Sequence, residues 1–116
     1  MRPDDLVASA KFLLDKPSPT EADCRIAVHA CYYAMLHVAG SYLGIDVAAA
    51  PDRHKAAMMG LQNRMMPNKR VVALRKGFAN AQRLRIRADY RIDAMVSTDD
   101  AEDVVEWARG VLAQPV

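Results

Sequence analysis

The amino-acid sequence predicts an all-α protein, an antiparallel up-and-down bundle of four to five helices that forms a single domain over residues 1–116. Three observations favour this class. Apolar residues make up 52% of the chain and charged residues 26%, which is the composition of a globular protein. The apolar residues recur with the period of a helix, and no segment alternates as a half-buried strand does. The six prolines fall between these periodic segments, and 116 residues suffice for one core.

The first expected helix covers roughly residues 3–16. Asp4 and Asp5 lie in its first turn, where the helix dipole favours negative charge. Pro17 ends it, because proline cannot continue the backbone hydrogen bonding of a helix.

The second expected helix runs to about Gly44. Ser18 is its N-cap, Pro19 takes the first helical position, and Glu21 completes a capping box three residues after the cap. Apolar or small side chains occupy nearly its whole circumference. Such a helix is either central to the bundle or covered by a second subunit.

The third expected helix opens at Pro51 and Asp52 and runs to about residue 66. Its methionines either fill gaps in the core or form a contact patch. They are Met58, Met59, Met65 and Met66.

Pro67 and Asn68 break the chain and cap a fourth helix over about residues 69–92. Its apolar side chains share one face. They are Val71, Leu74, Phe78, Ala81, Ala88 and Ile92. Ser97 caps the last helix, which is expected to bury one apolar stripe. That stripe consists of Val104, Val105, Ala108, Val111 and Leu112.

Charge is unevenly distributed along the chain. The formal net charge is only +2, too small by itself to indicate a nucleic-acid binder, yet half of the 16 lysines and arginines lie within residues 68–91. Four of these point directly away from the apolar stripe of the fourth helix. They are Lys69, Lys76, Arg83 and Arg87. This basic face is either a solvated surface or a footprint for a phosphate backbone.

Arg85 differs from these four because it points in the same direction as the apolar stripe. A guanidinium turned towards the core needs a partner, and Asp89, one turn further on, is the nearest carboxylate. The pair either locks the helix packing or lines a groove or dimer cleft where it meets a phosphate or a nucleobase.

The second helix carries a single polar sector, formed by Arg25, His29, Tyr33 and His37 at intervals of four residues. The two histidines are candidates for a general acid or base, for a metal site, or for polar residues at an interface. The metal reading is the weakest, because His29 and His37 lie two turns or about 12 Å apart. No metal and no cofactor are therefore expected.

Cys24 and Cys31 lie seven residues apart on the same expected helix, about 10.5 Å along its axis, which is too far for a disulfide. We expect both to be reduced. No secretory leader opens the chain, and no apolar run approaches the roughly 18 residues that span a membrane. A cytoplasmic location is expected, without membrane association.

Two segments resemble a known family. Residues 25–37, Arg-Ile-Ala-Val-His-Ala-Cys-Tyr-Tyr-Ala-Met-Leu-His, are similar to the HEPN (higher eukaryotes and prokaryotes nucleotide-binding) pattern Arg-x-Ala-x-x-x-x-Tyr-Tyr-Ala-x-Phe-His. Residues 84–90, Leu-Arg-Ile-Arg-Ala-Asp-Tyr, are similar to its later Leu-Arg-x-x-Ala-Asp-Tyr element. Both segments lie on expected helices, in the order of the family.

The resemblance implies a small helical bundle of bacterial or archaeal origin, usually a homodimer, that binds nucleotide or RNA. Many relatives are toxin-antitoxin or defence components, often encoded beside a nucleotidyltransferase that would be a protein partner. Active relatives cleave RNA without a metal, using an arginine followed after four to six residues by a histidine. Here Tyr90 stands where that histidine should follow Arg85, and a phenol is a poor base at neutral pH.

The sequence therefore predicts a nucleotide- or RNA-binding protein with a degenerate nuclease site. One alternative is an active metal-independent RNase that uses Arg85 with His29 or His37, and another is a structural or interaction protein without a ligand. The expected ligand-binding residues are Arg25, His29, Tyr33, His37, Arg85, Asp89 and Tyr90.

Overall fold

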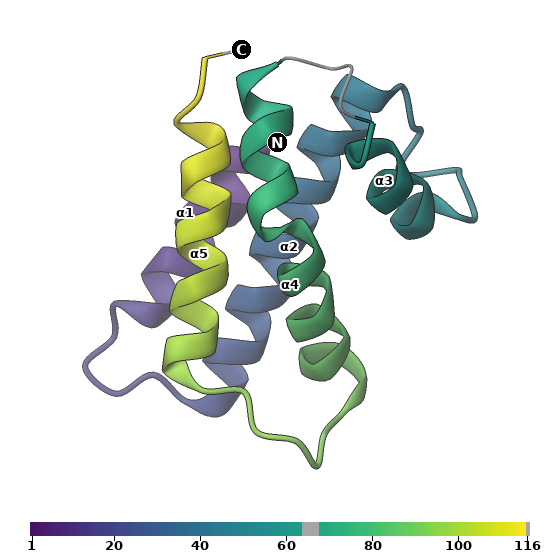
Figure 1. Cartoon of the computed structure of the whole chain (residues 1–116). Helices are drawn as coiled ribbons and strands as arrows, with labels where there is room; N and C mark the ends of the chain where they lie inside the picture. The colour runs from purple at the N-terminus through teal and green to yellow at the C-terminus, as the bar shows by residue number, and fades with distance from the viewer. Residues whose placement is uncertain (64–67, 116) are drawn as a thin grey trace.

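The computed structural model describes residues 1–63 and 68–115, and within them the chain forms five helices and no strand. These are α1 (Pro3–Leu14), α2 (Glu21–Leu43), α3 (Arg53–Leu61), α4 (Lys69–Tyr90) and α5 (Thr98–Leu112). Helices α1, α2, α4 and α5 run alternately up and down, so both termini lie at the same end, and the short α3 lies to one side (Figure 1). The expected all-α, up-and-down bundle is confirmed.

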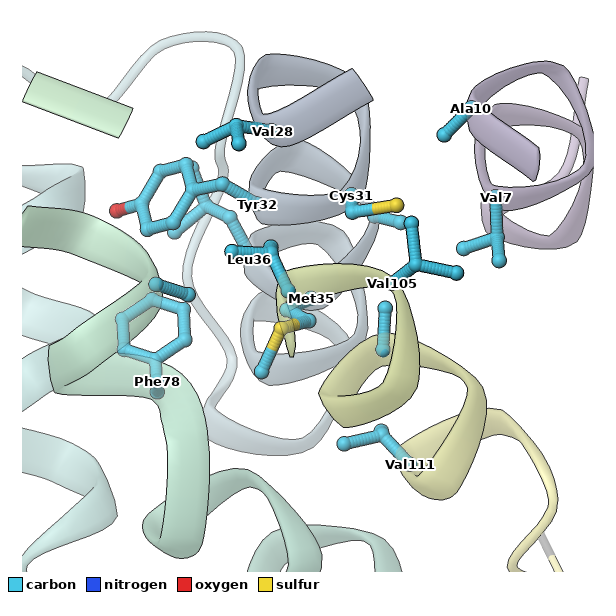
Figure 2. Packing of buried hydrophobic residues seen from close by; sticks show 14 of the residues in the cluster. Val7, Ala10, Val28, Cys31, Tyr32, Met35, Leu36, Phe78, Val105 and Val111 are labelled. Atoms are coloured by element: carbon cyan, nitrogen blue, oxygen red, sulfur yellow. The ribbon is translucent and has the colours of Figure 1, made fainter. Parts of the chain in front are cut away.

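Helix α2 is the centre of the molecule. It contacts each of the other four helices, and twelve of its residues are buried. Figure 2 shows how its side chains divide between neighbours, with Cys31 pointing towards α1 and Tyr32 towards the side on which Phe78 of α4 lies. Helix α2, which has apolar residues around its circumference, is thus central to the bundle. This is the first of the two interpretations that the sequence allowed.

The capping box at the start of α2 lies two residues later than expected. Thr20, not Ser18, is the N-cap, and its hydroxyl accepts a hydrogen bond from the backbone N–H of Asp23 at 3.1 Å. The Asp23 carboxylate accepts the Thr20 N–H in return, at 2.9 Å, and pairs with Lys16 at 3.3 Å. The hydrogen bond from Thr20 N–H and the nearby Lys16 lower the pKa of Asp23. The additional ion pair favours this box over one formed by Ser18 and Glu21.

Other helix ends also differ from the expected ones. Helix α1 ends at Leu14 and α3 at Leu61, each before the expected residue, whereas Asn68 and Ser97 cap α4 and α5 as expected. Part of the expected third helix, with Met65 and Met66, lies outside the described residues. Met58 is half-buried and Met59 exposed.

The expected burial of Ile92 is wrong. Helix α4 ends at Tyr90, so Ile92 no longer follows the helical stripe, and 80% of its surface is exposed. The other five residues of the stripe are buried.

The two cysteines are free and buried, in agreement with the expected reduced state. Burial raises the pKa of the Cys31 thiol to about 12, which leaves it unreactive at neutral pH. None of the described helices combines the length and apolar character needed to cross a membrane.

Candidate functional site

Arg85 is buried between α4 and α2 with only 5% of its surface exposed. Its Nη1 lies 3.6 Å from Oδ2 of Asp89, which is the ion pair expected from the sequence. Its Nε is buried and has no hydrogen-bond partner among the described residues. A buried guanidinium normally uses all its donors, so this one is incompletely satisfied.

Three tyrosine rings surround the Arg85 guanidinium. Its Cζ lies 5.1 Å from the centroid of Tyr32, 5.9 Å from that of Tyr33 and 5.7 Å from that of Tyr90. These are cation–π distances. Tyr32 is fully buried, whereas Tyr90 is 70% exposed at the end of α4. Of the three rings, Tyr90 is therefore the one most exposed to solvent.

His29 of α2 is oriented by the same carboxylate that pairs with Arg85. Its Nδ1 lies 2.9 Å from both oxygens of Asp89. An ionised carboxylate only accepts hydrogen bonds, so Nδ1 carries a proton, and in the neutral form of the ring the lone pair lies on Nε2. The His29 side chain is 51% exposed, and its ring packs on Tyr33 at 4.7 Å. This geometry suits a general base or a hydrogen-bond acceptor facing solvent.

His54 of α3 also belongs to the site, although no pattern in the sequence singled it out. Its Nδ1 lies 2.7 Å from the hydroxyl of Tyr32, and the two rings stack at 5.6 Å. Burial, together with the positive charges of Arg85 and Arg53, lowers the pKa of His54. Burial raises the pKa of Tyr32 to about 12, with Arg85 opposing the rise. A neutral His54 can therefore accept a hydrogen bond at Nδ1 from the Tyr32 hydroxyl, which keeps its proton.

The structure brings together most of the residues expected to bind ligand and separates two of them. We define the Arg85 cluster by its members, which are His29, Tyr32, Tyr33, His54, Arg85, Asp89 and Tyr90. Arg25 lies beside the cluster, but its guanidinium is bound to backbone carbonyls at the end of α4. His37 lines a different recess, of about 370 Å³, together with Arg2 and Ser41. No described contact connects His37 with Arg85.

The basic face of α4 lies apart from this cluster. Its four residues, Lys69, Lys76, Arg83 and Arg87, are all exposed, as expected. Arg87 follows Arg85 by two positions, or about 200° around the helix, so the basic face and the cluster occupy opposite sides of α4.

Among the described residues, no three histidine, cysteine or acidic side chains converge in a way that would hold a metal ion. Searches against protein-family models, curated proteins and solved structures found nothing similar to this chain.

The chemistry available at the cluster follows from its members. It combines a buried guanidinium, whose Nε–H has no hydrogen-bond partner among the described residues, with an imidazole oriented by Asp89. Two partly exposed aromatic rings lie beside them. Arginine donors favour phosphate oxygens, and aromatic faces favour stacked bases.

Proposed function

We propose that this protein binds nucleotides or RNA at the Arg85 cluster. The observation that carries the proposal is that Nε of this guanidinium, which is 5% exposed, has no hydrogen-bond partner in the part of the chain that the structure describes. Leaving a buried donor unsatisfied costs about 1–3 kcal/mol, more for a charged group. A phosphate oxygen would satisfy this donor and supply the negative charge that Asp89 only partly provides.

The tyrosines support a ligand that carries a ring as well as a phosphate. Tyr33 is half-buried and Tyr90 is largely exposed, so both have aromatic surface available for stacking. Rotation of the Tyr90 side chain would open the guanidinium to the ligand and offer its own ring to a base. Stacking of this kind contributes about 1–3 kcal/mol per base and tolerates any sequence.

The resemblance of residues 25–37 and 84–90 to HEPN proteins supports the same proposal. It adds a cellular setting: a cytoplasmic toxin-antitoxin or defence component, with a second copy or a nucleotidyltransferase as protein partner. Exposed apolar side chains on α2, on the last turns of α4 and in the segment that follows α4 favour a second copy. They are Ile26, Ile86, Tyr90, Ile92 and Met95.

The proposal is tested by calorimetric titration of the purified protein with AMP and with a short single-stranded RNA. Arg85→Met removes the charge while filling much of the same volume, and Arg83→Met on the exposed face of α4 is its matched control. We expect the wild type and Arg83→Met to bind equally and Arg85→Met to bind more weakly by tenfold or more, about 1.4 kcal/mol. Equal binding by all three proteins, or no binding by any, would overturn the proposal.

A second candidate function, metal-independent RNA cleavage, is favoured by the orientation of His29. With Nδ1 donating to Asp89, Nε2 is free to take the proton of a ribose 2′-hydroxyl. The 2′-oxygen then attacks the adjacent phosphorus, and the 5′-oxygen leaves and takes a proton from water. Arg85 would stabilise the charge that develops on the phosphate.

Cleavage is tested with labelled RNA in the presence of a chelator. We expect activity to disappear in His29→Gln and to persist in His37→Gln, because of these two histidines only His29 belongs to the cluster. Activity that survives in His29→Gln would rule out this role, and inactivity of the wild type on several RNAs would leave binding as the function.

A further inference from the structure

We propose that Arg25 is a positioning residue of the Arg85 cluster, which holds the last turn of α4 in place without touching the ligand. The inference deepens the proposed function, and it depends on that function only for its binding measurement. The last turn of α4 carries Asp89 and Tyr90, and through Asp89 it sets the orientation of His29.

Arg25 lies within hydrogen-bond distance of several carbonyl oxygens at the end of α4. The carbonyls at the C-terminal end of a helix lack partners within the helix, although the Arg87 carbonyl of α4 also accepts the backbone N–H of Arg91 at 3.0 Å. Arg25 donates to carbonyl oxygens both in the last turn of α4 and in the segment that follows it. From Nη1 the acceptors are Arg87 at 3.1 Å and Ala88 at 3.0 Å; from Nη2 they are Arg91 at 3.1 Å, Ile92 at 3.4 Å, and Ala94.

The opposite edge of the same guanidinium is also occupied. Nε of Arg25 donates to Glu21 at 2.9 Å, and Nη2 lies 2.8 Å from the same carboxylate oxygen. All three nitrogens are therefore engaged, and the side chain is only 13% exposed. A phosphate could bind Arg25 only by displacing these partners. This separates Arg25 from Arg85, whose Nε has no hydrogen-bond partner within residues 1–63 and 68–115.

Arg25 and His29 both contact the end of α4. The two residues are one turn apart on α2, and both bind the last turn of α4. Arg25 donates to the carbonyls of residues 87 and 88, and His29 contacts the carboxylate of Asp89. Arg87 also pairs with Asp100 of α5, but at 3.8 Å and with 44% of its side chain exposed, which makes a weak anchor. Weakening the hydrogen bonds from Arg25 to the carbonyls of α4 should therefore move Asp89 away from His29.

The planar fork of arginine is needed for this contact. A lysine ammonium retains the positive charge at the C-terminal end of the helix dipole, but it cannot hold a carboxylate on one edge and several carbonyls on the other. Arg25→Lys thus tests the geometry while preserving the charge.

The structure provides a matched control in Arg70. It performs the same task at the end of α5, where Nε donates to the carbonyl of Gln114 at 3.0 Å and Nη2 to that of Leu112 at 3.3 Å. Arg70→Lys should therefore perturb a helix end by the same chemistry without affecting the cluster.

The experiment measures the tautomer of His29 by nitrogen NMR in the full chain, with His29→Gln for assignment. We expect the wild type and Arg70→Lys to show the Nδ1–H form, and Arg25→Lys to shift towards the Nε2–H form. AMP affinity should fall in Arg25→Lys and stay unchanged in Arg70→Lys. An unchanged tautomer in folded Arg25→Lys, or an equal shift in Arg70→Lys, would overturn the inference.

If Arg25→Lys does not fold, Glu21→Gln provides the test, because it weakens the anchor of Arg25 and leaves the arginine in place. It should shift the His29 tautomer in the same direction by a smaller amount, and no shift would count against the inference. If the wild type fails to bind AMP or RNA, the proposed function fails, while the tautomer measurement still decides the role of Arg25.

Discussion

Burial changes how much the ion pair of Arg85 and Asp89 contributes to stability. Its partner Asp89 is shared with His29, and the Nη1–Oδ2 distance of 3.6 Å is longer than a good charge-assisted hydrogen bond. A pair of this quality recovers only part of the cost of desolvating the guanidinium. The proposed function accounts for such a residue, because a group kept for binding need not contribute to stability.

This explanation predicts opposite effects on stability for the two partners. Arg85→Met should leave the free energy of unfolding unchanged or raise it, because an apolar side chain replaces an incompletely satisfied charge. Asp89→Ala should lower it by about 3 kcal/mol, because Arg85 would then be buried without a counter-charge. Urea denaturation of both variants measures the difference, and a large loss of stability in Arg85→Met would show that the pair is structural.

His54 predicts a pH dependence at the residue scale. Its pKa in the folded protein is lowered from the usual 6.5, so the folded state favours the neutral ring. Stability from this group is complete above about pH 6.5 and falls as the pH drops below that value, because the unfolded state then binds the proton more readily.

The test compares the wild type with His54→Asn, whose amide oxygen can still accept the Tyr32 hydroxyl. Between pH 7.5 and pH 5.5 the wild type should lose more free energy of unfolding than His54→Asn. Equal losses in the two proteins would contradict the prediction.

At the scale of the helices, arginines from neighbouring helices replace the usual glycine caps. Only α2 ends in a left-handed glycine, Gly44 with φ of 69°, and no other described residue has a positive φ. The carbonyls at the ends of α3, α4 and α5 are instead bound by side chains from other elements. These donors are Arg75 for α3, Arg25 for α4 and Arg70 for α5. The caps therefore act as tertiary contacts as well.

The corrected start of α2 gives a prediction for this helix. Thr20→Ala should lower the free energy of unfolding by about 1 kcal/mol, because the N–H of Asp23 loses its acceptor. Ser18→Ala should change it by less than about 0.5 kcal/mol, as is usual for an exposed residue without such a role. Thermal and urea unfolding of both variants measures the effects, and a larger loss in Ser18→Ala would restore the cap expected from the sequence.

For the molecule as a whole, the separation of charges limits what can bind at the cluster. The basic face of α4 and the Arg85 cluster lie on opposite sides of that helix, so a short strand held at the cluster contacts few cations besides Arg85. Counterion release then makes a small contribution to affinity.

The salt dependence of RNA binding measures this contribution. A ligand held through one phosphate should give a slope of about −0.7 for log affinity against log salt, whereas contact with four cations would give about −3. We expect the smaller slope, and the same slope in Arg83→Met. A steep slope that Arg83→Met reduces would instead identify the basic face as the footprint.

The sequence by itself determined the helices and the direction in which each residue points from its own helix axis. The inward direction of Arg85, its pairing with Asp89 and the outward basic face all followed from the 100° step of a helix, because these residues share α4. The apolar circumference of α2 left two interpretations, a central helix or one covered by a second subunit, and the contacts of α2 with all four other helices show that it is central. The end of α4 was missed by two residues, and the burial of Ile92 was wrong for that reason.

Only the tertiary structure decided which helices meet at the site. Periodicity places Arg25, His29 and His37 on one face of α2, but α4 contacts only part of that face, so His29 reaches Asp89, Arg25 caps α4, and His37 lines another recess. His54 entered the site because α3 folds back onto Tyr32. Contacts between helices depend on how packed side chains fit together, and no periodicity within one helix encodes that fit.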